Sequence, residues 1–143
     1  AGEPFGIEKG SRKIDVTLSI GIAMLDNKGE DITDVMKRAD QALYRAKRDA
    51  MLRGLWEKLR DTDVEISRPE GGFFIWIKLP TGTDTAKLYE GAVRARVQYT
   101  AGTSFFPNGG GERHIRLAFS FESPERCYEG AGLIAQAILD ARS

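Results

Sequence analysis

The chain has 143 residues, and its 21 basic and 21 acidic side chains leave it with no formal net charge. This length fits one domain whose core needs neither a metal nor a disulfide, and the zero net charge argues against attraction to nucleic acid or to an anionic membrane. A single cysteine, Cys127, excludes an internal disulfide and a multi-cysteine metal site, and a single histidine, His114, leaves little for a Ser-His triad or a zinc site.

The first part of the chain predicts a strand followed by a long helix. Residues 1–13 form a loose lead-in or a short edge strand, and residues 14–25 alternate with the period of a strand that has one buried face. Asp31 is a suitable N-cap, and apolar residues then recur at helical spacing to about residue 60. Gly54 is the weak point of this helix, because glycine has a low helix propensity.

The remaining chain carries the signals of four further strands and two further helices. In order these are strand material over 64–79 with a turn at 69–72, a helix over 84–95, a brief strand over 97–100, a glycine-rich loop over 102–111, a strand over 114–121 and a last helix from 123. Asp84 and Ser123 are the expected N-caps, and Pro124 occupies the first helical position, where proline is favoured.

The order β-α-β-β-α-β-β-α indicates an α/β (α+β) two-layer sandwich. We expect one mixed or antiparallel sheet of four to five strands, with three helices mainly on one face. The strand residues expected under the helices are Val16, Leu18, Ile20, Ile22, Phe73, Ile75, Ile77, Ile115, Leu117 and Phe119. The opposite face, which we expect to be open, gathers Phe74, Trp76 and Arg116 with smaller polar residues.

Two motifs early in the chain, VTLSIGIA over 16–23 and ADQALYRAK over 39–47, resemble the C-terminal part of diguanylate cyclase catalytic domains, the GGDEF family. The resemblance covers roughly residues 4–48. It implies that Lys47 corresponds to a lysine that acts on the nucleotide triphosphate, while the partner arginine is replaced by Met51. The GGDEF loop and the metal-binding carboxylate lie before this segment in the family, so we expect Lys47 to be an ordinary solvated side chain.

Two later motifs, RPEGGFFIWIKLP over 68–80 and GGGERHIRLAFS over 109–120, resemble the small C-terminal domain of class I/II pyridoxal-phosphate aminotransferases, of the aminoadipate type. The resemblance covers roughly residues 48–142. It implies that Arg116 matches the arginine that holds the substrate α-carboxylate in a bidentate fork. The lysine that forms the Schiff base belongs to the large domain of that family, outside the match. On an open sheet face we expect Arg116 to be solvated or ion-paired.

The two resemblances meet inside the helix predicted over 31–59. We interpret residues 1–143 as a single chimeric domain, recombined or designed from a GGDEF-like fragment (about 1–48) and an aminotransferase-like fragment (about 49–143); a natural gene fragment is the alternative. We expect no enzymatic activity, no catalytic, cofactor-binding or metal site, and no cofactor. The alternatives are a binding or self-association module, and a weak residual binder of carboxylates, pyridoxal phosphate or guanine nucleotides.

The open sheet face is the expected place for a partner. Phe74 and Trp76 form the candidate interaction patch, through which the chain either forms a two-fold homodimer or, with no partner required, stays monomeric. We expect a flexible loop at 109–111, because the glycine run precedes a strand instead of opening a helix, and a passive Cys127. No apolar run approaches the roughly 20 residues of a membrane span, and no signal-peptide core is present, so we expect a soluble protein compatible with cytoplasmic expression.

Overall fold

The computed structural model describes residues 4–9, 12–17 and 31–142, with side chains over 31–142. The chain groups into two compact units, residues 1–46 and 47–143. Within the described part, no helix combines the length and the apolar character needed to cross a membrane.

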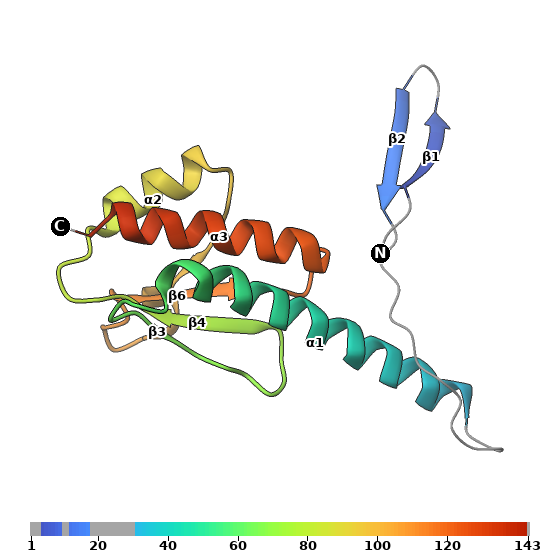
Figure 1. The fold of residues 1–143 in the computed structure, drawn as a ribbon, viewed down its shortest axis with the longest axis horizontal. Coiled ribbons are helices and arrows are strands. Elements are labelled where there is room, and N and C mark those ends of the chain that lie inside the picture. Colours follow the sequence, from blue (N-terminus) through green and yellow to red (C-terminus); the bar gives the residue numbers. More distant parts are fainter. Residues whose placement is uncertain (1–3, 10–11, 18–30, 143) are drawn as a thin grey trace. The chain divides into compact units, whose positions relative to one another are not determined.

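The first unit contains a hairpin in place of the single strand expected over 14–25. β1 (Pro4–Lys9) and β2 (Arg12–Thr17) pair antiparallel as a two-stranded sheet of their own (Figure 1). The register sets Phe5 opposite Val16 and Ile7 opposite Ile14, so the few apolar positions of the lead-in match those of the next strand. Among the described residues, 14–17 of the predicted strand therefore pair with the preceding strand β1, while its residues 18–25 lie outside the described residues.

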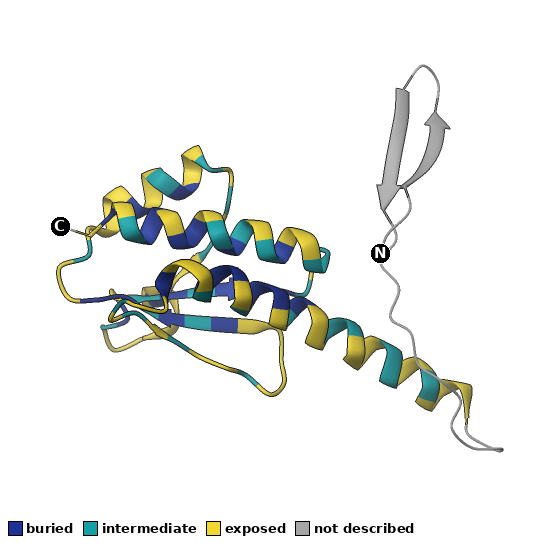
Figure 2. Cartoon of the chain, viewed as in Figure 1, coloured by how far each residue is buried: buried dark blue, intermediate teal, exposed yellow. Residues whose placement is uncertain are grey.

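α1 (Ile32–Leu59) is one continuous helix and confirms the long helix predicted over 31–59. Asp31 accepts a hydrogen bond from the Thr33 amide at 3.2 Å, as expected of an N-cap. Burial along α1 begins at Lys47, as Figure 2 shows. The apolar stripe expected before that point is not a core face, because Ile32 is 72% and Met36 63% exposed.

The second unit is an α+β fold built on an open four-stranded antiparallel sheet, in the order β3-β4-β6-β5. Its strands are β3 (Glu65–Ile66), β4 (Phe74–Lys78), β5 (Thr100–Ala101) and β6 (His114–Ala118), and its other helices are α2 (Thr85–Arg94) and α3 (Pro124–Asp140). β4 and β6 pair over all five residues, from Phe74 opposite Ala118 to Lys78 opposite His114. The predicted element order thus lacks the first strand of the N-terminal hairpin.

The strand expected over 97–100 is displaced to β5 by the turn that ends α2. The amides of Arg96 and Val97 donate to the carbonyls of Val93 and Ala92, each at 3.0 Å. These two hydrogen bonds end the helix, and the amides of Arg96 and Val97 are therefore not available to pair with β6. Only Thr100 and Ala101 remain to pair, with Arg116 and Ile115.

The core lies between the helices and one face of this sheet (Figures 1 and 2). The four inward strand residues predicted for β4 and β6 are buried: Ile75, Ile77, Ile115 and Leu117. Phe73, expected with them, is 44% exposed; it precedes β4, although its carbonyl oxygen accepts a hydrogen bond from the Phe119 amide at 3.0 Å. The predicted caps are confirmed, since Asp84 accepts from the amides of Ala86 and Lys87 and Ser123 accepts from that of Arg126.

α1 and α3 come into close contact at Gly54, which is buried. A Cβ atom at this position would lie 2.4 Å from the Tyr128 carbonyl oxygen and 3.0 Å from the Ala131 Cβ. The glycine that weakens α1 as an isolated helix is therefore the residue that makes room for the α3 backbone.

We expect Gly54→Ala to lower the free energy of unfolding by about 1–3 kcal/mol, because the added methyl group meets main-chain atoms that cannot rotate away. This loss outweighs the gain of about 1 kcal/mol in helix propensity. The matched control is Gly132→Ala in α3, where nothing lies within 4 Å of the added Cβ, and which should gain about 0.5–1 kcal/mol. Denaturant unfolding measures both; stabilisation by both substitutions would contradict the close approach.

Candidate functional site

Arg116 lies on the outer face of the sheet, opposite the core. Along β6, Ile115 and Leu117 are buried among the helices, so the intervening Arg116 occupies the other face. Its cross-strand neighbours are Trp76 in β4 and Thr100 in β5. The arginine is half-buried and not fully solvated, and it forms no ion pair with the residues that the structure describes.

Two phenyl rings enclose the guanidinium group of Arg116. Its Cζ lies 3.9 Å from the ring centroid of Phe74 and 4.1 Å from that of Phe105. Cation–π contacts of this kind hold the plane of the guanidinium and leave its N–H edge for a planar acceptor. The Nε atom is buried and has no hydrogen-bond partner among the described residues.

The loop after β5 brings Phe105 onto this face. The 3₁₀ helix η1 (Gly102–Phe105) follows β5 directly, and Phe105 packs edge-on against Trp76 with ring centroids 5.2 Å apart. A Cβ at Gly102 would lie 2.6 Å from the Gly111 carbonyl oxygen, so the two ends of the loop touch through their backbones. Gly111 has φ +82°, a left-handed conformation that suits glycine and turns the loop back towards β6. The glycine run expected to be flexible has this structural role.

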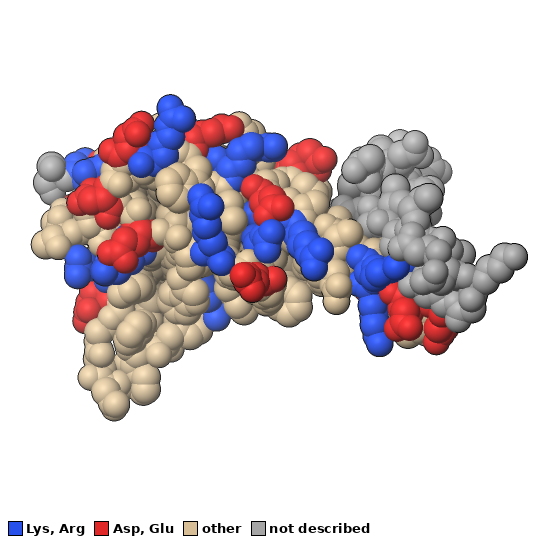
Figure 3. Space-filling model, turned by 60° about the horizontal axis from the view of Figure 1, so that its bottom comes forward, with Lys and Arg blue, Asp and Glu red and all other residues tan. Residues whose placement is uncertain are grey.

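The candidate interaction patch is only partly open. Phe74 is 38% exposed and stacks on Arg116, and Trp76 is half-buried beside Phe105. Lys78 on the same face is paired with Glu65 at 2.6 Å, and this contact lowers the pKa of the Glu65 carboxyl. Figure 3 shows charges of both signs interspersed over much of the visible surface, and a region without charges at the lower left of the view. Self-association through Phe74 and Trp76 stays a prediction.

A hollow of about 380 Å³ adjoins Arg116 at the β5 edge of the sheet. Tyr99 and Thr100 line it together with Arg116, and burial raises the pKa of the Tyr99 phenol. Its size falls in the range of small-molecule sites, about 300–1,000 Å³. No lysine is among its lining residues in the described part of the chain, so these residues do not fit pyridoxal phosphate, which needs a lysine for its Schiff base.

Lys47 lies on the helix-covered side of the sheet and does not join Arg116. It is only 6% exposed, and its ammonium group donates a hydrogen bond to the Ser120 carbonyl oxygen at 3.0 Å. The expectation of a solvated lysine is therefore wrong. The reason is that α1 continues into the core, which places this position over the chain just after β6.

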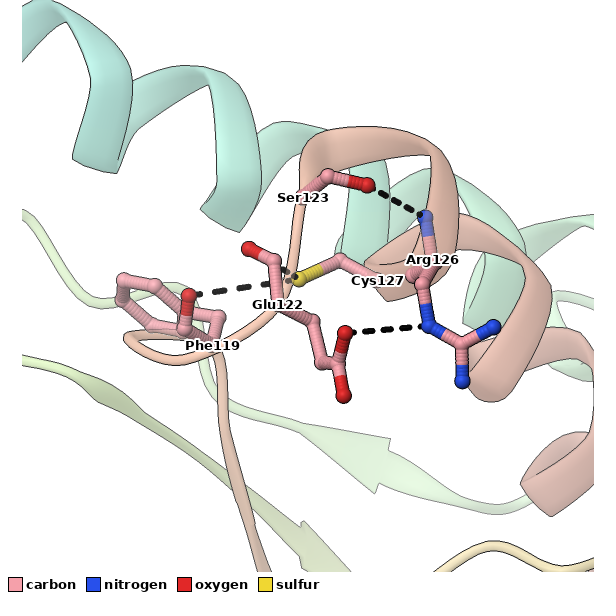
Figure 4. A network of polar contacts seen from close by, with 5 residues as sticks. All are labelled: Phe119, Glu122, Ser123, Arg126 and Cys127. Atoms are coloured by element: carbon pink, nitrogen blue, oxygen red, sulfur yellow. Dashed lines mark hydrogen bonds and ion pairs between the residues drawn. The ribbon is translucent and has the colours of Figure 1, made fainter. Parts of the chain in front are cut away.

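Cys127 lies in the first turns of α3, within a small polar network (Figure 4). Its Sγ is 3.9 Å from the carbonyl oxygens of Phe119 and Glu122, and Arg126 is paired with Glu122 at 3.0 Å. A helix N-terminus normally lowers a thiol pKa. Here burial dominates and raises the pKa of Cys127 to about 11, although the nearby Lys47 charge opposes it.

The structure thus brings together three of the residues singled out in the sequence, Phe74, Trp76 and Arg116, and leaves Lys47 apart. Phe105 was missed, because its contact with Arg116 depends on how the loop over 102–111 folds back. The sequence feature that could have indicated Phe105 is its place three positions after Gly102, the glycine with which η1 begins. His114 packs its ring against Phe106, and no group of three or more metal-ligating side chains gathers among the described residues.

Comparison with known proteins confirms both resemblances. Residues 3–53 match the family model for the diguanylate cyclase GGDEF domain. The rest of the chain is similar to aromatic-amino-acid aminotransferase 1 of Thermococcus litoralis, with 39% identity over 95 residues, and to 2-aminoadipate transaminase of Thermus thermophilus, with 35% identity over 96 residues. These matches cover 66% and 67% of this chain but 22% and 24% of those proteins.

Solved structures of aminotransferases are also similar to this chain in fold. The α-aminoadipate aminotransferase of Thermus thermophilus matches with a TM-score of 0.69 and 32% identity, over 78% of this chain and 28% of that one. The multiple substrate aminotransferase of Thermococcus profundus matches with a TM-score of 0.67 and 33% identity, over 76% and 27%. The chain therefore spans about a quarter of the length of the aminotransferases it resembles.

We expect the Cys127 thiol to resist alkylation by iodoacetamide at pH 8 in the folded protein, because a pKa of about 11 keeps it protonated and burial keeps it from the reagent. In denaturant it should react at the rate of a free cysteine. Mass spectrometry of the alkylated protein measures both rates, and fast alkylation of the folded chain would contradict the buried thiol.

The same raised pKa makes stability depend on alkaline pH. The folded thiol keeps its proton to a higher pH than the unfolded thiol, whose pKa has the ordinary value of 9.0. The contribution of this difference to the free energy of unfolding is therefore fully present below pH 9 and is lost as the pH rises towards 11. In denaturant unfolding measured between pH 8 and 11, Cys127→Ala should show a smaller fall in the free energy of unfolding than the parent chain. The part of the fall that comes from Tyr99 should remain in the variant.

Proposed function

We propose that the chain has no catalytic activity of its own and is a structural domain, recombined or designed from fragments of two enzyme families that share one helix. The observation that carries this proposal is the position of Lys47. It lies inside the segment that matches the GGDEF family, yet its ammonium group is bonded to the Ser120 carbonyl, in the segment that resembles aminotransferases.

The burial of Lys47 supports a structural use of this residue. An ammonium group that is taken from water must find hydrogen-bond acceptors, and the Ser120 carbonyl oxygen is one. A lysine held in this way cannot reach out to a triphosphate without giving up that bond. Met51, which stands where the GGDEF resemblance expects an arginine, is packed in the core.

The aminotransferase side supports the same proposal. The chain covers 22–24% of the curated relatives, and the resemblance assigns the Schiff-base lysine to the large domain, outside this match. The hollow beside Arg116 offers no lysine among the described residues to replace it. Arg116 would then be retained as part of the packed outer face.

The test combines two assays with one substitution. We expect no cyclic dinucleotide from GTP and magnesium, and no saturable absorbance of an internal aldimine with pyridoxal phosphate. Lys47→Met should lower the free energy of unfolding by about 1–3 kcal/mol, because it removes a charged hydrogen bond. Lys87→Met, at an exposed position of α2, is the control and should change it by less than about 0.5 kcal/mol.

Turnover in either assay would overturn the absence of catalysis. A stabilisation by GTP that Lys47→Met abolishes would overturn the structural role of the lysine.

A second function, the binding of a carboxylate, is favoured by the stacking of Arg116 between Phe74 and Phe105. The rings orient the guanidinium, and the hollow beside it has room for a small acid. The relatives include a 2-aminoadipate transaminase, whose name specifies a dicarboxylic amino acid. We propose that this chain likewise binds a carboxylic acid at Arg116, weakly and without catalysis.

Titration with 2-aminoadipate, followed by NMR, tests this second function. We expect saturable shifts at the amides of Thr100, Arg116 and Ala118, which line the hollow. Arg116→Gln should weaken binding about tenfold or more, because the lost bidentate pair is worth about 1.5–3 kcal/mol. Arg94→Gln, at an exposed position of α2, should leave it unchanged. Equal binding by both variants would exclude Arg116 as the site.

A further inference from the structure

A second, larger hollow of about 530 Å³ lies on the helix side of the sheet. Its floor is apolar and consists of core side chains from three elements: Met51 of α1, Leu117 of β6 and Ile134 of α3. Arg116 does not line it, although the two hollows adjoin and share Val93, Val97, Gln98 and Ala118. A cavity of this volume with an apolar floor is typical of a small-molecule site.

The rim of this hollow carries a net positive charge. Arg96, Arg126 and Glu122 are its charged lining residues. Glu122 accepts a hydrogen bond from Arg126 Nε at 3.0 Å, which balances one of the two cations. Figure 4 shows the two terminal nitrogens of Arg126 outside the contacts drawn. One positive charge is therefore left in excess, the complement of a monoanion.

Arg96 occupies a position that favours glycine. Its φ is +58°, and it is the only non-glycine residue with positive φ among the described residues. It is the left-handed residue of the turn that ends α2, where glycine is the usual choice and an arginine is strained. Strain of this kind tends to persist where the side chain has a use. Here the conformation places an arginine at the rim of the hollow.

We propose that the 530 Å³ hollow binds a small apolar monocarboxylic acid. The hydrocarbon body lies on Met51, Leu117 and Ile134, and the carboxylate pairs with Arg96 and Arg126, since guanidinium groups match carboxylates in geometry and charge. The Cys127 thiol, which also lines the floor, is uncharged and compatible with an apolar body. The proposal does not depend on the absence of catalysis or on Arg116.

The test is titration of the whole chain with octanoate, followed by calorimetry and by amide shifts in NMR. We expect saturable binding with shifts at Val97, Leu117 and Gly130. Octanamide, which keeps the body and lacks the charge, should bind about tenfold more weakly, and acetate, which lacks the body, should not bind.

Two substitutions locate the site without threatening the fold. Gly130→Leu fills the hollow from α3, where the nearest atom to an added Cβ is Val97 Cγ1 at 3.9 Å, and should abolish binding; Gly132→Leu, with open space around it, should not. Arg96→Gly relieves the left-handed strain, so the variant should melt at a higher temperature than the parent and bind octanoate about tenfold more weakly.

The outcomes separate this site from the one at Arg116. Loss of octanoate binding in Gly130→Leu but not in Arg116→Gln supports the proposal. Absence of saturable binding, equal affinity for octanoate and octanamide, or loss of binding in Arg116→Gln would each overturn it. The 2-aminoadipate titration of Arg116 is read independently, because Gly130 does not line that smaller hollow.

Discussion

The close approach of α1 to α3 at Gly54 is the constraint on which the second unit depends. With the Tyr128 carbonyl oxygen 2.4 Å from where a Cβ would lie, the two backbones nearly touch. That contact directs Leu55 and Leu59 into the core, where both are fully buried. It also fixes the position of the preceding turns of α1 over the sheet, so that Lys47 lies beside Ser120. The second half of α1, the helix in which the two family resemblances meet, thus packs in the core against α3.

On the outer face of the sheet, Arg116 is held by stacking on aromatic rings, whereas Lys78 on the same face is held by an ion pair with Glu65. Arg116 has lost part of its water, and ring faces of Phe74 and Phe105 compensate its charge where a carboxylate usually would. The loop that supplies Phe105 is held by the backbone contact between Gly102 and Gly111. The guanidinium is therefore oriented by packing before any acid is present, which reduces the entropic cost of binding one.

Both hollows have one structural cause, the shortness of β5. The turn that ends α2 uses Arg96 and Val97, so the chain pairs with β6 only at Arg116 and Ile115. The end of β6 at Ala118 then borders both hollows, one lined by Arg116 and the other by Arg96 and Arg126. Two arginine-lined spaces, each with its own arginines, thus adjoin at the same edge of the sheet and share Val93, Val97, Gln98 and Ala118.

The sequence by itself determined the features that depend on neighbouring residues. The caps at Asp31, Asp84 and Ser123, the continuity of α1 and the buried alternation in β4 and β6 follow from local hydrogen bonding and from the period of each element. The two family resemblances were also visible there, because each motif is contiguous.

Only the tertiary structure decided what depends on distant segments. Gly54 looks like a defect in α1 until the α3 backbone is placed against it, and Lys47 looks solvated until Ser120 is brought over it. Phe105 reaches Arg116 only after its loop folds back, and Ile32 and Met36 in the first half of α1 stay exposed despite their helical period. The physical reason is the same in each case: periodicity and propensity report on the residue's own element, whereas burial and close approach are properties of the element it meets.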